Sequence, residues 1–378
     1  LDDVERLWEG GKILLGPMVR ASSLPLRLTA LEYGADTVYS EEIPDHRARN
    51  CERVVNNVID TIDFVDTSNT MVSSKPLVLF RTHIDKEVQK KCCVLQLGTS
   101  SAESALAAAI KFERDIAAID INMGCAKHYS VSRNRGSALM TKPEVAEDII
   151  KTLRRNLSVP VSVKTRVKSL PPEIINGATI SEANIDRKGS LEWVRQLQMA
   201  GAQAIAIHMR SPVEKNRDPA HRIDGIFPML YQSLQTTNTP CIYNGDIFTV
   251  RDVEELHANI TEFFIDTADA DAAADGDGDG GGCGARVPIA NNWRSKGVPI
   301  MLARSGLWNP HLFRDLKAAS VKWQRGVCES TDSNNSRVSS SSGTIYPGHS
   351  AMYCSPNPSP LPNPICTTAA AAAAAAAA

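Results

Sequence analysis

The stretch Ile116-Ala-Ala-Ile-Asp-Ile-Asn-Met-Gly-Cys125 decides how the rest of the chain is interpreted. Its apolar run, Ile116–Ile119, predicts a short buried strand, and the glycine before Cys125 loosens the loop that follows. In a (β/α)₈ barrel the catalytic groups lie at the carboxyl ends of the strands. Cys125 is therefore a candidate catalytic residue, with a small buried thiol in the core as the alternative.

Apolar runs and amphipathic stretches alternate on both sides of this segment. Eight runs are predicted as strands: Lys12–Leu15, Thr37–Tyr39, Val94–Leu97, Ile116–Ile119, Val161–Lys164, Ala204–Ile207, Cys241–Tyr243 and Val298–Leu302. Helices are predicted at Leu24–Tyr33, Ser101–Phe112, Pro143–Asn156 and Leu191–Met199. This alternation predicts an α/β fold, a (β/α)₈ TIM barrel.

Three local features refine these boundaries. Thr141 is a possible N-cap for the helix at Pro143–Asn156. Leu77–Phe80 also has the composition of a strand, and we expect it to form a hairpin with Val94–Leu97. Pro299 is unusual inside a central strand because proline cannot donate a ladder hydrogen bond.

Composition divides the 378 residues into a barrel domain at 1–320 and a low-complexity, disordered tail at 321–378. Within the barrel domain, residues 268–284 form an acidic Gly/Asp segment, which we expect to be a flexible insert. The net charge is −2, and the aspartates from Asp266 to Asp279 hide a mildly basic remainder. Charge alone therefore neither requires nor excludes a nucleic-acid partner.

The chain shows no secretory signal and no apolar run long enough to span a membrane. Its nine cysteines are scattered without the spacing of a metal site, which favours reduced thiols. We therefore expect a cytoplasmic monomer that binds neither metal nor membrane.

Asp120-Ile-Asn-Met-Gly-Cys125 resembles the Asn-x-Gly-Cys-Pro signature of the tRNA-dihydrouridine synthases, and the resemblance runs from about Lys12 to Phe313. It is strongest to the eukaryotic branch that acts at position 20, and Ala126 replaces the usual proline. The resemblance implies an FMN enzyme that uses NADPH to reduce a uridine in the D loop of tRNA to 5,6-dihydrouridine. Cys125 would donate a proton to that uridine.

The same resemblance implies a set of flavin-binding residues, which follow the predicted strands. They are Pro17, Met18, Val19, Glu42, Gln96, Lys164, His208, Asn244, Gly245, Asp246, Ala303 and Arg304. A lysine at the end of an apolar strand is costly unless an anionic partner offsets its charge, as reduced FMN would. The glycine-bearing turns at 243–246 and 303–306 can direct backbone N–H groups at a phosphate. A satisfied core histidine is the alternative interpretation of His208, but its place at the same strand end as Lys164 and Cys125 favours a flavin contact.

Two basic clusters follow the fourth and sixth predicted strands and could engage RNA phosphates. They are Lys127, His128, Arg133 and Arg135, and then Arg210, Lys215, Arg217 and Arg222. Ordinary solvated loops are the alternative. Two other functions stay open: a small-molecule FMN oxidoreductase of the dihydroorotate dehydrogenase type, and an inactive, truncated paralogue that binds RNA without turnover.

Overall fold

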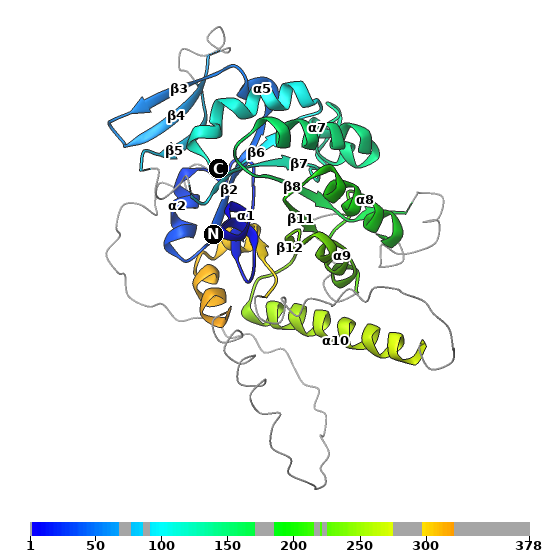
Figure 1. Ribbon diagram of the computed structural model, residues 1–378. Coiled ribbons are helices and arrows are strands. Elements are labelled where there is room, and N and C mark those ends of the chain that lie inside the picture. The colour runs from blue at the N-terminus through cyan, green and yellow to red at the C-terminus, as the bar shows by residue number, and fades with distance from the viewer. Residues whose placement is uncertain are drawn as a thin grey trace, which may run out of the picture. The chain divides into compact units, whose positions relative to one another are not determined.

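The computed structural model describes residues 2–67, 77–85, 91–170, 185–214, 220, 225–274 and 297–320. Within them a closed barrel of parallel strands has the order β1-β13-β12-β11-β8-β7-β6-β2 (Figure 1). Its strands are β1 (Ile13–Leu15), β2 (Thr37–Pro44), β6 (Cys93–Gly98), β7 (Ala118–Asn122), β8 (Val161–Arg166), β11 (Ala204–His208), β12 (Cys241–Asn244) and β13 (Ile300–Leu302). All eight predicted strands are present, and the (β/α)₈ fold is confirmed.

The amino end of the barrel is filled by apolar side chains. Helix α1 (Asp3–Trp8) contributes Leu7 and Trp8, both fully buried, and the Trp8 indole donates a 2.9 Å hydrogen bond to the Tyr39 hydroxyl. Inward-facing strand residues complete this cluster: Leu14, Val94, Ala118, Ala204, Ala206, Ile242 and Met301. The amino end is therefore part of the hydrophobic core, and the polar side chains inside the barrel lie at its carboxyl end.

Helices surround the barrel, and Figure 1 shows α5, α7, α8 and α9 following one another around it. Their bounds are α2 (Leu24–Glu32), α5 (Ala102–Phe112), α7 (Pro143–Asn156), α8 (Arg187–Ala200), α9 (Ile226–Leu234), α10 (Val250–Ala274) and α12 (Arg304–Trp308), and residues 311–320 are also helical. Ser101 caps α5 by accepting the Ser104 N–H at 3.2 Å. Thr141 does not cap α7, because its hydroxyl donates to the Ala138 carbonyl instead.

The expected hairpin between Leu77–Phe80 and Val94–Leu97 is wrong. β5 (Leu77–His83) pairs with β4 (Thr61–Asp66), which pairs with β3 (Cys51–Asn56), in a separate antiparallel sheet. Figure 1 places this sheet beside α5. The rings of Phe64, Phe80 and Phe112 join the two, with 4.4 Å between the centroids of Phe64 and Phe112. Shared apolar packing against α5 thus gives β5 a partner outside the barrel.

Other boundaries also differ from those expected. β7 extends three residues beyond Ile119, and Pro299 lies just before β13, where its carbonyl accepts the Tyr243 N–H at 2.9 Å. α10 continues to Ala274, because the alanines at the start of the expected insert favour a helix. Residues 275–284 and the expected tail at 321–378 lie outside the described part of the chain. No described helix is long and apolar enough to cross a membrane.

Candidate active site at the carboxyl end of the barrel

The loop after β7 places Cys125 at the carboxyl end of the barrel. The Asn122 side-chain oxygen accepts the N–H groups of Gly124 and Cys125 at 3.0 and 2.9 Å. Arg166 holds the same loop from β8, donating through Nε to the Gly124 carbonyl at 2.5 Å. A Cβ on Gly124 would lie 3.3 Å from the backbone carbon of Thr165, so a side chain there would be crowded. The thiol is thereby fixed in place yet keeps partial exposure.

Behind this loop a hydrogen-bonded network crosses three strands. The Gln96 amide donates to Asp120 at 2.8 Å and accepts from the Asn122 amide at 3.2 Å. The Ser162 hydroxyl donates to the other Asp120 oxygen at 2.7 Å. Burial raises the pKa of Asp120 to about 6, although both hydrogen bonds and the Lys164 charge oppose the rise. Asp120 is therefore a buried carboxylate at neutral pH, beside Lys164.

Lys164, Arg166 and His208 bring basic groups to the same end of the barrel. Burial, followed by the Arg166 charge, lowers the pKa of Lys164 to about 8, while Asp120 opposes the shift. Burial also lowers the pKa of His208 well below its usual range, with the Arg166 and Lys164 charges next. The imidazole is thus neutral at pH 7 and can both donate and accept a hydrogen bond. All three side chains keep part of their surface accessible.

Glu42 reaches the thiol from β2. A β-bulge between Tyr39 and Glu42 sets Glu42 opposite Gln96, so this residue lies within the strand and not in the loop after it. Its carboxyl packs on Gly98, where an added Cβ would lie 2.1 Å from Oε1. Burial raises the pKa of Glu42, and the Arg135 charge and hydrogen bonds with Cys125 and Asn122 oppose the rise. Glu42 therefore belongs to the immediate surroundings of Cys125.

The loops after the last two strands form a second group. Asp246 receives ion pairs from Arg210 and from Arg304, the latter at 3.4 Å, and accepts the Ala220 N–H at 3.0 Å. The Asn244 amide donates to the Met301 carbonyl at 2.8 Å, which joins β12 to β13. Gly245 and Ala303 complete the two turns, and Arg304 begins α12. Arg304 keeps 37% of its side chain exposed while it pairs with Asp246.

Residues 16–19 follow β1 at the same end. The Gly16 N–H donates to the Leu302 carbonyl at 2.6 Å, which places this loop beside the one that precedes α12. The Ser22 hydroxyl donates to the Gly16 carbonyl at 2.8 Å and accepts the Met18 N–H at 3.0 Å. A Cβ on Gly16 would meet the Met301 side chain at 3.0 Å, so a side chain there would crowd the neighbouring strand. Pro17 and Met18 are half-buried, and Val19 is exposed.

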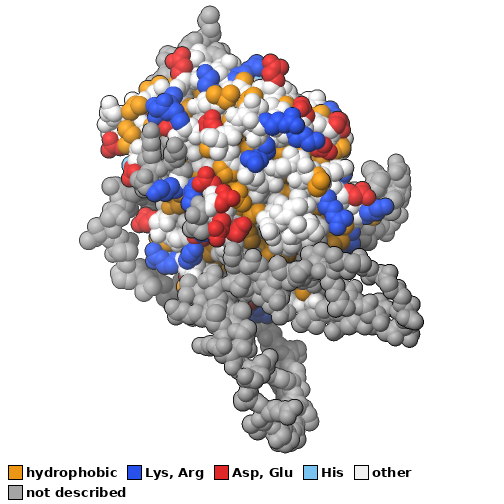
Figure 2. Space-filling model, viewed as in Figure 1, with side chains coloured by type: hydrophobic (Ala, Val, Ile, Leu, Met, Phe, Trp, Pro, Cys, Tyr) orange, Lys and Arg blue, Asp and Glu red, His pale blue; other side chains and the backbone are white. Residues whose placement is uncertain are grey.

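The two basic clusters are only partly confirmed as exposed surfaces. Lys127, His128 and Arg133 are exposed, whereas Arg135 and Arg210 are buried, at 4% and 2% exposure. The expectation that these two arginines face RNA is wrong, because Arg210 pairs with Asp246 and Arg135 faces Gly98. The other members, Lys215, Arg217 and Arg222, lie outside the described residues. On the face in Figure 2, basic and acidic side chains are interspersed.

Three residues of this site were given no role from the sequence: Asp120, Asn122 and Arg166. Their signal was present, because polar residues at positions i and i+2 of an otherwise buried strand must face the same side. Ending the predicted strand at Ile119, three residues too early, put Asp120 and Asn122 in a loop. With β7 at Ala118–Asn122, the same alternation directs both side chains into the barrel.

Comparison with known proteins identifies the family. The profile of the dihydrouridine synthase (Dus) family matches residues 14–262, which is more than half of the chain. The chain belongs to the dihydrouridine synthase family. The match includes the Cys125 loop and the strand-end residues Lys164, His208 and Asn244, so the Dus fold carries the site described above.

Two curated relatives carry more specific names. A tRNA-dihydrouridine(20) synthase of Saccharomyces cerevisiae is 34% identical over 253 residues, which are 66% of this chain and 60% of the yeast protein. A protein of the same name from Schizosaccharomyces pombe is 30% identical over 246 residues, 64% of this chain and 46% of that protein. The matched region thus spans about half to three-fifths of these relatives. Both names specify NAD(P)⁺.

The residues present fit a flavin mononucleotide. Lys164, Arg166 and the neutral imidazole of His208 are enclosed by protein yet keep accessible surface, so two cations and a hydrogen-bond donor can face a planar, electron-rich group. Gln96 and Asn122 supply amide groups on the same network. At the other side, the partly exposed Arg304 and the turn at Gly245 suit a phosphate.

Proposed function

We propose that this chain reduces uridine to 5,6-dihydrouridine in the D loop of tRNA, at position 20, with FMN and NADPH. The observation that carries the proposal is the Cys125 thiol, fixed by Asn122 and Arg166 at the barrel end that also holds Lys164 and His208. The names of the two yeast relatives support the choice of uridine 20 and of a nicotinamide reductant. Family membership also favours this function over that of a small-molecule flavin oxidoreductase.

The flavin would lie across the ends of β6, β8 and β11. Gln96 would hydrogen-bond its ring edge, and Lys164 and His208 would face the N1–O2 edge, where negative charge gathers on reduction. Pro17, Met18 and Val19 would cover the ring, and Arg304 with the turn at Gly245 would bind the phosphate. When bound, the flavin supplies the hydride for C6 of the uracil.

Cys125 would supply the proton for C5. A positioned thiol can act as a general acid. Arg166 holds the Gly124 carbonyl, so the direction of the thiol is set by the loop and not by solvent. The uridine would have to leave its stack to reach the thiol, which favours a flexible RNA loop over a helix.

A single-turnover reaction tests this proposal. Photoreduced, FMN-loaded protein is mixed with unmodified tRNA transcript, and flavin reoxidation is followed at 450 nm without oxygen. Nuclease digestion and mass spectrometry then locate the dihydrouridine. Reoxidation with one dihydrouridine at position 20 is expected. If the dihydrouridine lies at a different uridine, the proposed activity stands but the choice of position 20 is wrong. If tRNA does not reoxidise the flavin, the result supports an inactive RNA-binding paralogue.

A further inference from the structure

Arg135 is a buried cation on the far side of the Cys125 loop. Only 4% of the residue is exposed, and its NH1 group reaches the Gly98 carbonyl at 3.4 Å. Its Nε has no hydrogen-bond partner among the described residues. The arginine is tied to the catalytic loop, because the nearby Ser137 N–H donates to the Cys125 carbonyl at 3.0 Å. A buried guanidinium needs a counter-charge nearby.

Glu42 supplies that counter-charge. The Glu42 carboxyl packs on Gly98, and the Arg135 guanidinium contacts the carbonyl of the same residue. The two charged groups therefore share Gly98 as a neighbour. Arg135 is the strongest influence opposing the rise in the pKa of Glu42, and the Cys125 thiol hydrogen-bonds the same carboxyl. The Gly98 contacts of Glu42 and Arg135, and the tie from Ser137 to Cys125, therefore gather the cation, the carboxyl and the thiol in one cluster.

The thiol has a second neighbour, the Tyr129 hydroxyl, 3.8 Å from its sulfur. Burial, followed by the Cys125 charge, raises the pKa of Tyr129 above its usual value. A phenol is a weaker acid than a thiol, so giving a proton to a thiolate is uphill for Tyr129. A carboxylic acid is the stronger acid, and the same transfer from Glu42 is downhill.

We propose that Glu42 returns a proton to Cys125 after each turnover, and that Arg135 is a positioning residue that holds Glu42 against Gly98. The inference rests on the function proposed above, in which Cys125 gives its proton to C5 of the uracil. The sulfur is left as a thiolate beside the Glu42 carboxylate. That carboxylate takes a proton from water, its new O–H bond then breaks, and the S–H bond forms again. One solvent proton therefore enters the product for each turnover, and Glu42 is a carboxylate between turnovers.

Alkylation of Cys125 tests the arrangement without tRNA. The rate of its reaction with iodoacetamide at pH 7.5 is measured by peptide mass spectrometry, because only the thiolate reacts. Glu42→Gln removes a negative neighbour and should raise the rate about three- to tenfold, because a like charge nearby disfavours the thiolate. Arg135→Met should lower the rate, because it leaves the Glu42 charge unopposed. Arg135→Lys, which keeps the charge, should lie between Arg135→Met and wild type if Arg135→Met does not fold.

The matched control is Glu41→Gln, which removes the neighbouring carboxylate that accepts the Arg20 N–H. It should leave the alkylation rate within about twofold of wild type. Rates that change in the same direction for Glu42→Gln and Arg135→Met, or that do not change, overturn the arrangement.

Turnover tests the relay itself. Glu42→Gln should slow steady-state dihydrouridine formation about tenfold more than it slows the first turnover, since only later turnovers need a proton to be returned to the sulfur. If Tyr129→Phe shows this difference and Glu42→Gln does not, Tyr129 is the donor and the proposal is wrong. If tRNA does not reoxidise the wild-type flavin, both the proposed function and the proton relay are wrong. A faster alkylation of Cys125 in Glu42→Gln and a slower one in Arg135→Met would still establish the arrangement of Glu42 and Arg135.

Discussion

The two ends of the barrel differ in what their side chains can do. At the carboxyl end, Asp120, Lys164 and His208 have pKa values moved by burial and by one another, and a partly exposed thiol lies among them. Perturbed titratable groups gathered at one place are the physical mark of a reactive site. In a (β/α)₈ barrel this is also the end where the loops carry chemistry.

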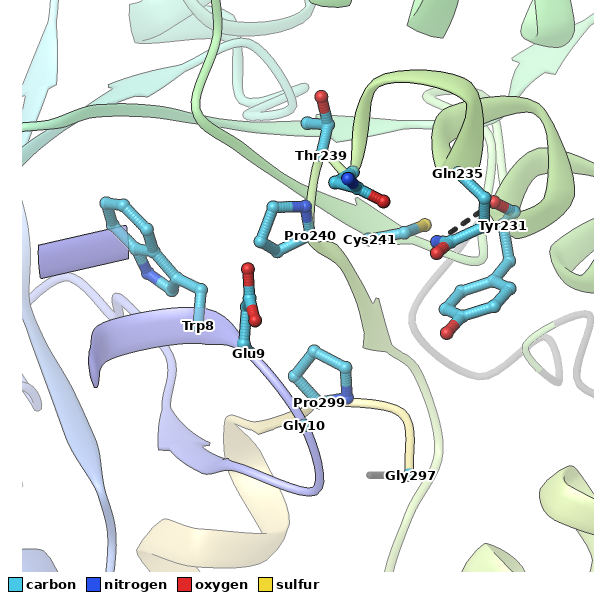
Figure 3. A pocket seen from close by; sticks show the side chains of 11 residues that line it. Trp8, Glu9, Gly10, Tyr231, Gln235, Thr239, Pro240, Cys241, Gly297 and Pro299 are labelled. Atoms are coloured by element: carbon cyan, nitrogen blue, oxygen red, sulfur yellow. Dashed lines mark hydrogen bonds between the residues drawn. The ribbon is translucent and has the colours of Figure 1, made fainter. Parts of the chain in front are cut away.

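The amino end holds a cavity of about 200 Å³ without such a set of groups. Figure 3 shows Trp8, Pro240 and Pro299 around Glu9, the one carboxylate among the lining residues. The thiol there, Cys241, is fully buried, and burial raises its pKa far above the usual value. A hollow alone is therefore a poor guide to function. Interacting charged groups and a thiol with access to a reactant distinguish the carboxyl end.

The largest effect is expected for Cys125→Ala. A positioned general acid contributes about 10²–10⁴-fold, so reoxidation of the reduced flavin by tRNA should slow by that factor. Flavin content and flavin reduction by NADPH should stay near normal, because neither uses the thiol. Stopped-flow absorbance at 450 nm measures both half-reactions. A variant that loses its flavin would mean that Cys125 is a packing residue like Cys241, and the contrast between the two ends would disappear.

A smaller effect is expected for Lys164→Met. A charge-assisted hydrogen bond contributes about 1.5–3 kcal/mol, so affinity for FMN should fall about ten- to a hundredfold. Fluorescence titration of flavin-free protein gives this affinity. Asp120→Asn keeps the shape of the side chain but removes the negative charge beside Lys164. This variant should also have a lower affinity for FMN. Unchanged affinity in both variants would place the flavin away from β7 and β8.

The pH dependence of stability should also report Lys164. Its pKa is about 8 in the folded chain and 10.5 when unperturbed, so between these values the unfolded state binds more protons. The free energy of unfolding of the flavin-free protein should therefore gain a positive contribution as pH rises from about 8 to 10. Urea denaturation of wild type and Lys164→Met measures the difference. If the two have the same pH slope, the Lys164 ammonium is not desolvated.

The smallest effect on activity is expected at the opposite end. Cys241→Ala should leave flavin affinity and both half-reactions within about twofold, although losing a fully buried sulfur should cost roughly 1 kcal/mol of stability. Thermal unfolding and the same stopped-flow assays give both numbers. A large fall in activity without loss of stability would show that the amino-end cavity takes part in the chemistry.

The sequence was enough to predict the barrel and which side chains lie at its carboxyl end, because each strand is a short apolar run and these side chains lie at or just after its end. Their roles stay predictions. Cys125, Lys164, His208 and Arg304 follow from that rule and from the family resemblance. The sequence could not show which polar groups meet across strands. Arg210 forms an ion pair with Asp246, which lies 36 positions later in the chain. The sequence does not show this pair, so Arg210 was predicted to be an exposed basic residue.

The sequence also did not show which strands pair with one another outside the barrel. β5 has the composition of a barrel strand, and only the packing of Phe64 and Phe80 against Phe112 shows that it belongs to a different sheet. Likewise, Arg135 lies in a polar loop whose composition predicts exposure, and the carboxyl that balances its charge comes from Glu42, more than 90 residues earlier. Tertiary contacts decide these cases, and local pattern does not.

The most direct test of the carboxyl-end site is the flavin content of the purified protein, measured by absorption before and after incubation with excess FMN and gel filtration. We predict about one FMN per chain, with bands near 375 and 450 nm, and weaker retention in Arg304→Ala than in Cys241→Ala. A colourless protein that takes up no added FMN, or one whose retention falls with Cys241→Ala and not with Arg304→Ala, would contradict a flavin site at the carboxyl end of the barrel.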